Sequence, residues 1–213
     1  MRSKLRHSIA WIMTCTLTAV SSGGLTSGWQ EEKLDYKVQH PWDVSESSRF
    51  AKDGWTYHIW LFNNDQPRVK GDAHEPRTEM RFNPDYTSGA HQFEADMMVP
   101  AGTDNVTIMQ IHTGDAQSSE FGPVAIMLQV HGGSLHNGNK AVLLPSIYGK
   151  WFHLNVIHDL GAGTLEVYIN DKLVSSGHPK SAGDFYFKCG CYEAGAGSHE
   201  MQVYIKNLKL WSK

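Results

Sequence analysis

The sequence predicts an all-β fold, an antiparallel sandwich of the jelly-roll type. Apolar residues recur at every second position in many short segments, which is typical of strands with one buried face. These segments are rich in β-branched and aromatic residues and are bounded by Gly, Pro, Asn or Asp. No segment has the 3.6-residue period of an amphipathic helix. Many short strands in one domain favour a sandwich whose concave sheet forms an open groove.

The expected strands follow one another closely along the chain. They cover residues 55–62, 77–82, 91–99, 106–112, 124–131, 151–159, 164–170, 185–192 and 201–211. Gly161-Ala162-Gly163 is expected to form a hairpin loop, and Asn170-Asp171 the next turn, because these residue types suit tight turns.

The length and charge of the chain indicate one globular domain. The 213 residues are 40% hydrophobic and 19% charged, and no long polar tract suggests disorder. We assign residues 22–50 to a loosely attached lead-in and residues 51–213 to the domain. The formal net charge of −3 provides no positive potential to attract phosphates, which disfavours nucleic acid as a partner. No apolar run reaches the roughly 18 residues that a membrane-spanning helix needs. We expect the protein to be a monomer.

Residues 1–21 are predicted to be a signal peptide. Arg2, Lys4 and Arg6 form a basic start, residues 9–20 form a short apolar stretch, and small residues at 19–21 suit cleavage. The protein is therefore expected to be secreted and extracellular. Removal of this segment takes away three basic residues and no acidic one, so the formal net charge falls from −3 to −6.

Three expected strands carry polar residues along one face and apolar residues along the other. The polar faces comprise Arg77, Glu79 and Arg81; Gln110 and His112; and Tyr186, Lys188, Gly190 and Tyr192. Each face alone is more typical of a cross-strand charge ladder or an ordinary surface. Together, they predict a site that receives an anion.

The same strands resemble a known family. Arg-Thr-Glu-Met-Arg at 77–81, Gln-Ile-His at 110–112 and Tyr-Phe-Lys-Cys-Gly-Cys-Tyr at 186–192 occur in the order of the three signature strands of polysaccharide lyase family 7, the alginate lyases. The resemblance implies a concanavalin-like β-jelly roll. Two departures are Cys189, where the family usually has Ala, and Glu193-Ala194, where it has Asn-Gln. The glucuronan lyases of family 20 are similar and are the nearest rival.

The resemblance implies a reaction by β-elimination. Such a lyase removes the C5 proton of a uronic acid and expels the 4-linked oxygen, so the sugar carboxylate must first be neutralised. The resemblance gives this role to Arg81, Gln110 and His112, although Arg77 has the same chemistry. Tyr192 is expected to transfer the proton if nearby cations such as Lys188 lower its pKa from about 10.

Further residues are expected to bind the uronate chain, most simply alginate. These substrate-binding candidates are Arg77, Glu79, Lys188, Tyr186, Gln129 and His131. Within the family, Ile111 between the Gln and the His is associated with guluronate-containing substrates. The scheme requires no metal or cofactor, although neighbouring families sometimes hold a structural calcium.

Three other readings of the sequence compete with the lyase. A non-catalytic carbohydrate-binding sandwich would use the same strands without turnover. Glu94 and Asp96 resemble part of the carboxylate strand of retaining glucanases, but the third acid that this pattern needs falls at Val99, which disfavours hydrolysis. The twelve histidines lack the tight spacing of a zinc site.

Cys189 and Cys191 lie on one strand face and are expected to be buried free thiols.

Overall fold

The fold is described from a computed structural model that covers residues 24–113, 124–138, 140–179 and 183–213. The expected signal peptide, residues 1–21, lies outside the described residues. Within the described part, the chain forms fifteen strands and one short 3-10 helix, η1 (Glu46–Ser48). No helix in this part is both long enough and apolar enough to cross a membrane.

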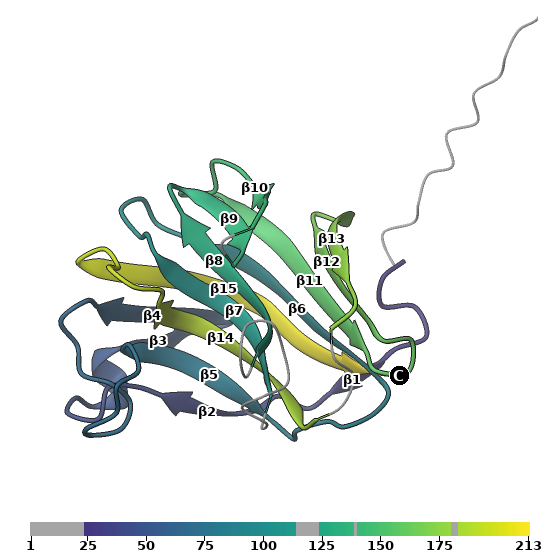
Figure 1. Ribbon diagram of the computed structural model, residues 1–213, viewed down its shortest axis with the longest axis horizontal. Helices are drawn as coiled ribbons and strands as arrows, with labels where there is room; N and C mark the ends of the chain where they lie inside the picture. Colours follow the sequence, from purple (N-terminus) through teal and green to yellow (C-terminus); the bar gives the residue numbers. More distant parts are fainter. Residues whose placement is uncertain (1–23, 114–123, 139, 180–182) are drawn as a thin grey trace, which may run out of the picture.

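The strands form two antiparallel sheets that pack face to face (Figure 1). The first sheet has the order β13-β12-β11-β6-β15-β4-β3, with β1 also paired to β15. Its strands are β1 (Gln30–Glu32), β3 (Phe50–Asp53), β4 (Thr56–Phe62), β6 (Ala90–Met98), β11 (Trp151–Asp159), β12 (Thr164–Ile169), β13 (Lys172–Gly177) and β15 (Glu200–Ser212). We call it the rear sheet.

The second sheet has the order β10-β9-β8-β7-β14-β5-β2 and lies in front of the first in Figure 1. Its strands are β2 (Asp35–Gln39), β5 (Arg77–Asn83), β7 (Val106–Thr113), β8 (Val124–His131), β9 (Ser134–Asn137), β10 (Val142–Leu144) and β14 (Phe185–Glu193). We call it the front sheet. All three polar faces found in the sequence belong to it.

The predicted all-β sandwich is confirmed, and each expected strand is present to within one residue at either end. The expected hairpin loop joins β11 to β12, and Asn170 and Asp171 turn between β12 and β13 with φ angles of 50° and 63°. The boundary of the domain at residue 51 is wrong. The strand β2 pairs with β5 over five residues, so part of the expected lead-in is a strand of the front sheet.

The core lies between the sheets and takes the apolar half of each alternating strand. Phe82 and Phe187 from the front sheet meet Phe93 from the rear sheet, with ring centroids 6.3 Å and 6.1 Å from that of Phe93. Removal of this apolar surface from water stabilises the sandwich. Cys189 and Cys191 are buried here as free thiols, as the sequence predicts.

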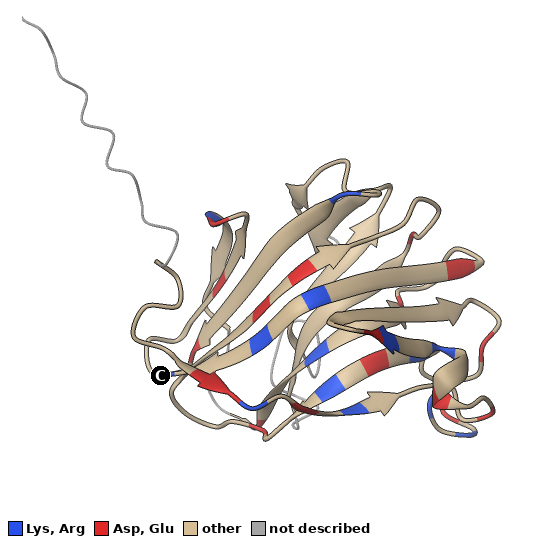
Figure 2. Cartoon of the chain, turned by 180° about the vertical axis from the view of Figure 1, so that it is seen from behind, with Lys and Arg blue, Asp and Glu red and all other residues tan. Residues whose placement is uncertain are grey.

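The outer face of the rear sheet carries charges of both signs on adjacent strands (Figure 2). Lys206 lies opposite Asp96 and Lys209 opposite Glu94 in the β15–β6 register. His153 contacts both carboxylates, with Nδ1 2.7 Å from an Asp96 oxygen and Nε2 3.4 Å from a Glu94 oxygen. These contacts raise the pKa of His153 to about 9 despite partial burial. Both carboxylates of the rejected hydrolase pattern therefore serve as ion-pair partners.

Gly190 allows β14 and β5 to approach closely at the centre of the front sheet. Its φ angle is 146°, and a Cβ at this position would lie 2.3 Å from the Thr78 carbonyl oxygen and 2.7 Å from the Glu79 Cα. The β14–β7 register shifts between Cys189 and Tyr192 at the same place. A side chain at Gly190 would push β5 away and displace its polar face.

Gly190→Ala is therefore expected to lower the free energy of unfolding by more than about 1 kcal/mol, because the contact is with backbone that cannot move aside. Gly177→Ala, at the end of the edge strand β13, is the control for the glycine-to-alanine change itself, since its Cβ would meet nothing within 4 Å. Urea unfolding followed by circular dichroism measures both. Equal stability of the two variants would contradict this account of Gly190.

Candidate active site

The register of the front sheet brings the three polar faces side by side, with β14 in the middle. Lys188 lies opposite Gln110 of β7 on one side and Arg81 of β5 on the other. Tyr186 lies opposite His112, and Tyr192 lies opposite Arg77. Residues more than 100 positions apart in the chain thus meet on one face because the strands pair antiparallel.

A cavity of about 330 Å³ opens on this face. Its lining residues are Gln39, Arg68, Asp72, His74, Arg77, Gln110, His112, Val124, Met127, Tyr186, Lys188 and Tyr192. The predicted polar faces therefore meet in one cavity, which contains Arg77 of β5 together with Gln110, His112, Tyr186, Lys188 and Tyr192. We call it the primary cavity.

A buried ion pair lies at the base of the primary cavity. The Lys188 Nζ donates to Glu79 Oε2, and the side chains are 2% and 1% exposed. Burial opposes the charge on Glu79, but the charges of Lys188 and Arg77 outweigh it and lower the pKa of this carboxyl. Burial lowers the pKa of Lys188 in turn. Of the two predicted substrate-binding residues, Lys188 lines the primary cavity and Glu79 does not, and the two side chains neutralise each other at its base.

Gln110 is oriented by the same ion pair. Its Nε2 donates to Glu79 Oε1 at 2.6 Å, and the side chain is buried. This contact fixes the amide, with the nitrogen directed at Glu79 and a second N–H remaining on the same atom. Gln110 can therefore present a fixed hydrogen-bonding group to a ligand in the primary cavity.

His112 is held as a neutral ring with a defined tautomer. Its Nδ1 lies 2.7 Å from the Thr113 carbonyl oxygen, which can only accept, so Nδ1 carries the proton and Nε2 has the free lone pair. The Tyr186 hydroxyl is 3.0 Å from the same Nδ1, and the two rings stack with centroids 5.1 Å apart. Burial, aided by the charge of Lys188, lowers the pKa of His112 to about 4. At pH 7, His112 can therefore accept a proton.

The pKa of Tyr192 shifts upwards, in the opposite direction to that of His112. Burial raises the pKa of its hydroxyl, and the charge of Arg77, whose guanidinium lies 4.0 Å from the ring centroid, only partly offsets this. The condition set for Tyr192 in the sequence analysis, that nearby cations lower its pKa below the ordinary value, is therefore not met. Desolvation is the larger effect, and Tyr192 is a protonated phenol at pH 7.

The two arginines of β5 occupy different places. Arg77 lines the primary cavity, with Nη1 3.5 Å from Glu79 Oε2. Arg81 stacks on the Tyr186 ring at 4.0 Å and donates to Asp85 Oδ2 at 2.6 Å. Arg81 lines a neighbouring cavity and not the primary one. The arginine beside Tyr192 and Gln110 is therefore Arg77, whereas the sequence-based assignment favours Arg81.

Gln129 and His131 continue the same sheet face but do not line the primary cavity. The Gln129 Nε2 donates to Thr107 Oγ1 at 3.2 Å, and the His131 Nδ1 lies 2.8 Å from Asn105 Oδ1. These contacts tie the two side chains to neighbouring strand residues.

Sequence reasoning misses the residues that the N-terminal strand and a loop contribute. Gln39 ends β2, and Arg68, Asp72 and His74 belong to the connection between β4 and β5. Asp72 and His74 bind each other, with Asp72 Oδ1 2.5 Å from His74 Nδ1. A loop has no period-two pattern, so nothing in the sequence marks Arg68 as a site residue.

A metal site is not evident among the described residues. No group of three or more His, Cys, Asp or Glu side chains in this part of the chain is arranged to hold a metal ion.

Comparison with known proteins identifies the family. Residues 30–212 match the family described as alginate lyase. The chain belongs to this family. Its family membership makes it a polysaccharide lyase, as the three motifs predict. The family acts on an anionic polysaccharide.

Three known proteins are similar to this chain. The citrate-binding protein of Hevea brasiliensis is 35% identical over 195 residues, which cover 87% of this chain and 78% of that protein. An alginate lyase of polysaccharide lyase family 7 has a TM-score of 0.66 at 22% identity, covering 84% of this chain and 95% of its own. An alginate lyase from Pseudomonas aeruginosa has a TM-score of 0.65 at 16% identity, covering 84% and 98%. The two structures confirm the jelly-roll fold.

Glu79→Gln is expected to destabilise the protein by about 3–5 kcal/mol, because it leaves the Lys188 ammonium buried without its counter-charge. The double variant Glu79→Gln/Lys188→Met removes both charges and is expected to recover most of that loss. Urea unfolding of wild type, both single variants and the double variant gives the coupling energy. Additive losses would show that the pair does not act as a unit.

Proposed function

We propose that this protein is a secreted lyase that cleaves alginate by β-elimination and needs no metal or cofactor. One observation carries the proposal. A single cavity contains a neutral His112 with a free Nε2, a protonated Tyr192, and the hydrogen-bond donors Arg77 and Gln110. These are the base, the acid and the carboxylate-binding groups that the elimination requires.

The proposed reaction begins with the carboxylate of the sugar at the cleavage site. Arg77 and Gln110 bind its oxygens and stabilise the negative charge that develops when C5 loses its proton. The proton passes to His112 Nε2, and its electron pair forms the C4=C5 double bond. The C4–O bond breaks, and the leaving oxygen takes the Tyr192 proton. The step leaves His112 protonated and Tyr192 as a phenolate, and proton exchange with solvent restores both groups. The product is an unsaturated uronate.

The protonation states favour guluronate at the cleavage site. In guluronate, the C5 proton and the leaving oxygen lie on opposite sides of the ring, so the base and the acid must be two groups. His112 and Tyr192 fit this division. In mannuronate and glucuronate, the two lie on the same side, and a tyrosine that acts alone must first lose its own proton. Its raised pKa opposes that step. The protein is therefore expected to prefer guluronate blocks, with glucuronan the less favoured alternative.

A second candidate function is the binding of a small polycarboxylate without turnover. The relative from Hevea brasiliensis is named for citrate binding, and the same cavity offers Arg77 and Arg68 to carboxylates. A binder of this kind needs the cations but has no need for a proton acceptor and a proton donor at the same site. The two functions therefore make different demands on His112 and Tyr192.

The proposed function is tested by incubating the protein with guluronate blocks, mannuronate blocks, glucuronan and a neutral glucan. Lysis creates a double bond conjugated to the carboxylate, so ultraviolet absorbance is expected to rise together with reducing ends, most strongly on guluronate. Reducing ends without absorbance would identify a hydrolase. Citrate binding by calorimetry with no product from any polymer would support the second candidate.

Variants of the two proton-transfer residues are expected to differ in substrate dependence. Tyr192→Phe should lower kcat/KM by about 10²-fold or more on every block, because the acid is lost in all cases. His112→Asn should lower it mainly on guluronate.

In the wild type, kcat/KM should fall as pH drops towards the His112 pKa of about 4. Circular dichroism controls for folding, and near-wild-type activity of folded Tyr192→Phe would remove this residue from the mechanism.

A further inference from the structure

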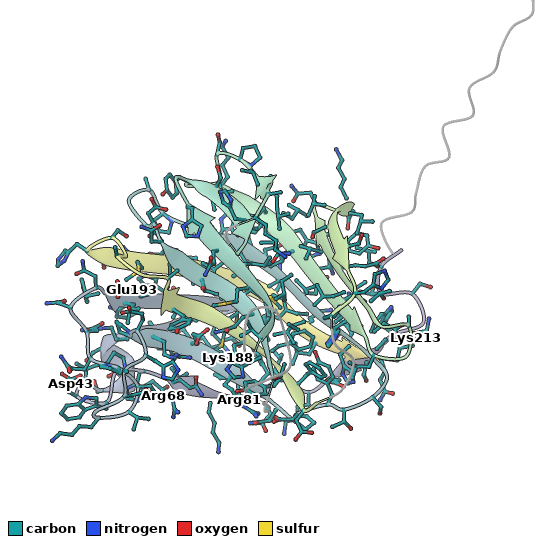
Figure 3. The ribbon with its side chains drawn as sticks, viewed as in Figure 1. Asp43, Arg68, Arg81, Lys188, Glu193 and Lys213 are labelled. Atoms are coloured by element: carbon teal, nitrogen blue, oxygen red, sulfur yellow. The ribbon has the colours of Figure 1, made fainter. Side chains whose placement is uncertain are left out.

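The outer face of the rear sheet carries aromatic side chains that the core does not use. On β4, Ile59 and Leu61 are buried between the sheets, whereas His58 and Trp60 alternate with them and point outwards. Figure 3 shows Lys188 beside β14 of the front sheet, which faces the viewer, so this outer face lies on the opposite side of the sandwich from the primary cavity. We call it the rear face.

The strand register places further side chains in a row with His58, across four strands. Tyr204 of β15 lies opposite His58 of β4 on one side and Met98 of β6 on the other. Trp151 of β11 lies opposite Met98 from the far side of β6. Directly opposite residues of an antiparallel pair share one face, and three strand spacings span roughly 14 Å. We call His58, Trp60, Tyr204 and Trp151 the aromatic row.

The aromatic row offers both ring surface and hydrogen-bond donors to a ligand. His58 stacks with two rings, its centroid lying 4.2 Å from that of Tyr204 and 4.6 Å from that of Trp60. The Tyr204 hydroxyl and the Trp60 indole N–H have no hydrogen bond to another described residue, and neither atom is buried. Trp151 is 41% exposed, and Lys206 Nζ lies 4.2 Å from its ring centroid. Partly exposed aromatic side chains with free donors are typical of a binding surface.

The charges beside the aromatic row neutralise one another. Three basic and three acidic side chains lie there, on β1, β6, β11 and β15: His153, Lys206, Lys209, Glu31, Glu94 and Asp96. Lys209 Nζ is 3.1 Å from Glu31 Oε2. His153, with a pKa of about 9, is protonated at pH 7 and contacts Glu94 and Asp96. These six charges sum to zero, so this part of the rear face has no net charge that would attract a polyuronate.

A neutral polysaccharide has the chemistry that matches this surface. A β-1,4-linked glucan is an extended ribbon whose sugar faces present C–H groups to aromatic rings and whose edges present hydroxyls to donors such as those of Tyr204 and Trp60. We propose that the rear face binds a neutral β-linked glucan, with the aromatic row as the contact surface. This site is separate from the candidate active site. Because the two lie on opposite sides of the sandwich, the protein can hold a neutral polymer and a uronate chain at the same time.

The test measures binding of the protein to cellohexaose by calorimetry and to insoluble cellulose by depletion from solution. Trp151→Ala is expected to weaken both by about tenfold, because it removes the most exposed ring of the aromatic row. Tyr204→Phe keeps the ring and deletes only the hydroxyl, so it is expected to weaken both by about fivefold. Trp42→Ala is the matched control, since Trp42 is 43% exposed but shares a cavity with Arg81 of the front sheet. It should leave both affinities unchanged, and circular dichroism checks the folding of each variant.

Several results would overturn the proposal. The wild type would then bind neither cellohexaose nor cellulose, or Trp151→Ala would bind them no more weakly than Trp42→Ala does. Displacement of cellohexaose by guluronate oligomers, measured in the Tyr192→Phe background, would place the glucan in the primary cavity instead. Dimerisation in sedimentation experiments that Trp151→Ala abolishes, without glucan binding, would make the rear face an interface between two copies of the chain.

Each of these results is independent of turnover. Failure of the lyase assay with glucan binding intact would reject the proposed reaction and leave the rear-face site standing.

Discussion

The ion pair between Glu79 and Lys188 is the constraint on which the arrangement of the site depends. Both charges are buried, so each requires the other, and together they fix the alignment of β5 against β14. The second Glu79 oxygen holds the amide of Gln110 on β7, and Arg77 lies near the first. A single carboxylate thus connects three strands and two of the groups that face the ligand. Gly190 serves the same end, because it allows the two strands to approach.

Burial, more than the neighbouring charges, decides the protonation of His112 and Tyr192. It disfavours the charged form of each group, and so it lowers the pKa of His112 and raises that of Tyr192. The result is a neutral base and a neutral acid in one cavity at pH 7. A bound carboxylate would bring negative charge beside His112 and raise the pKa of this ring, which strengthens the base only when substrate is present.

The strands and the shared polar face could be predicted from the sequence because both follow from a period of two. The burial of each side chain could not be predicted, because alternation places Arg77, Glu79 and Arg81 on one face of the sheet but does not determine which of them is buried. In the structure, Glu79 is buried, Arg77 lines the primary cavity, and Arg81 turns to Asp85. Arg68 escaped prediction for a different reason, since it comes from a loop that only the fold brings to the sheet.

Recognition of a carboxylate and elimination make separable demands on this site. Binding requires only cations and oriented amides, which Arg77 and Gln110 provide whether or not a reaction follows. Elimination also requires a proton acceptor and a proton donor with the right charge states, and these depend on how deeply His112 and Tyr192 are buried. The similarity of this chain both to the alginate lyase family and to a protein named for citrate binding is consistent with this separation. In this chain, His112, Tyr192, Arg77 and Gln110 line one cavity, so the groups that the proposed elimination needs are present together with those that carboxylate binding needs.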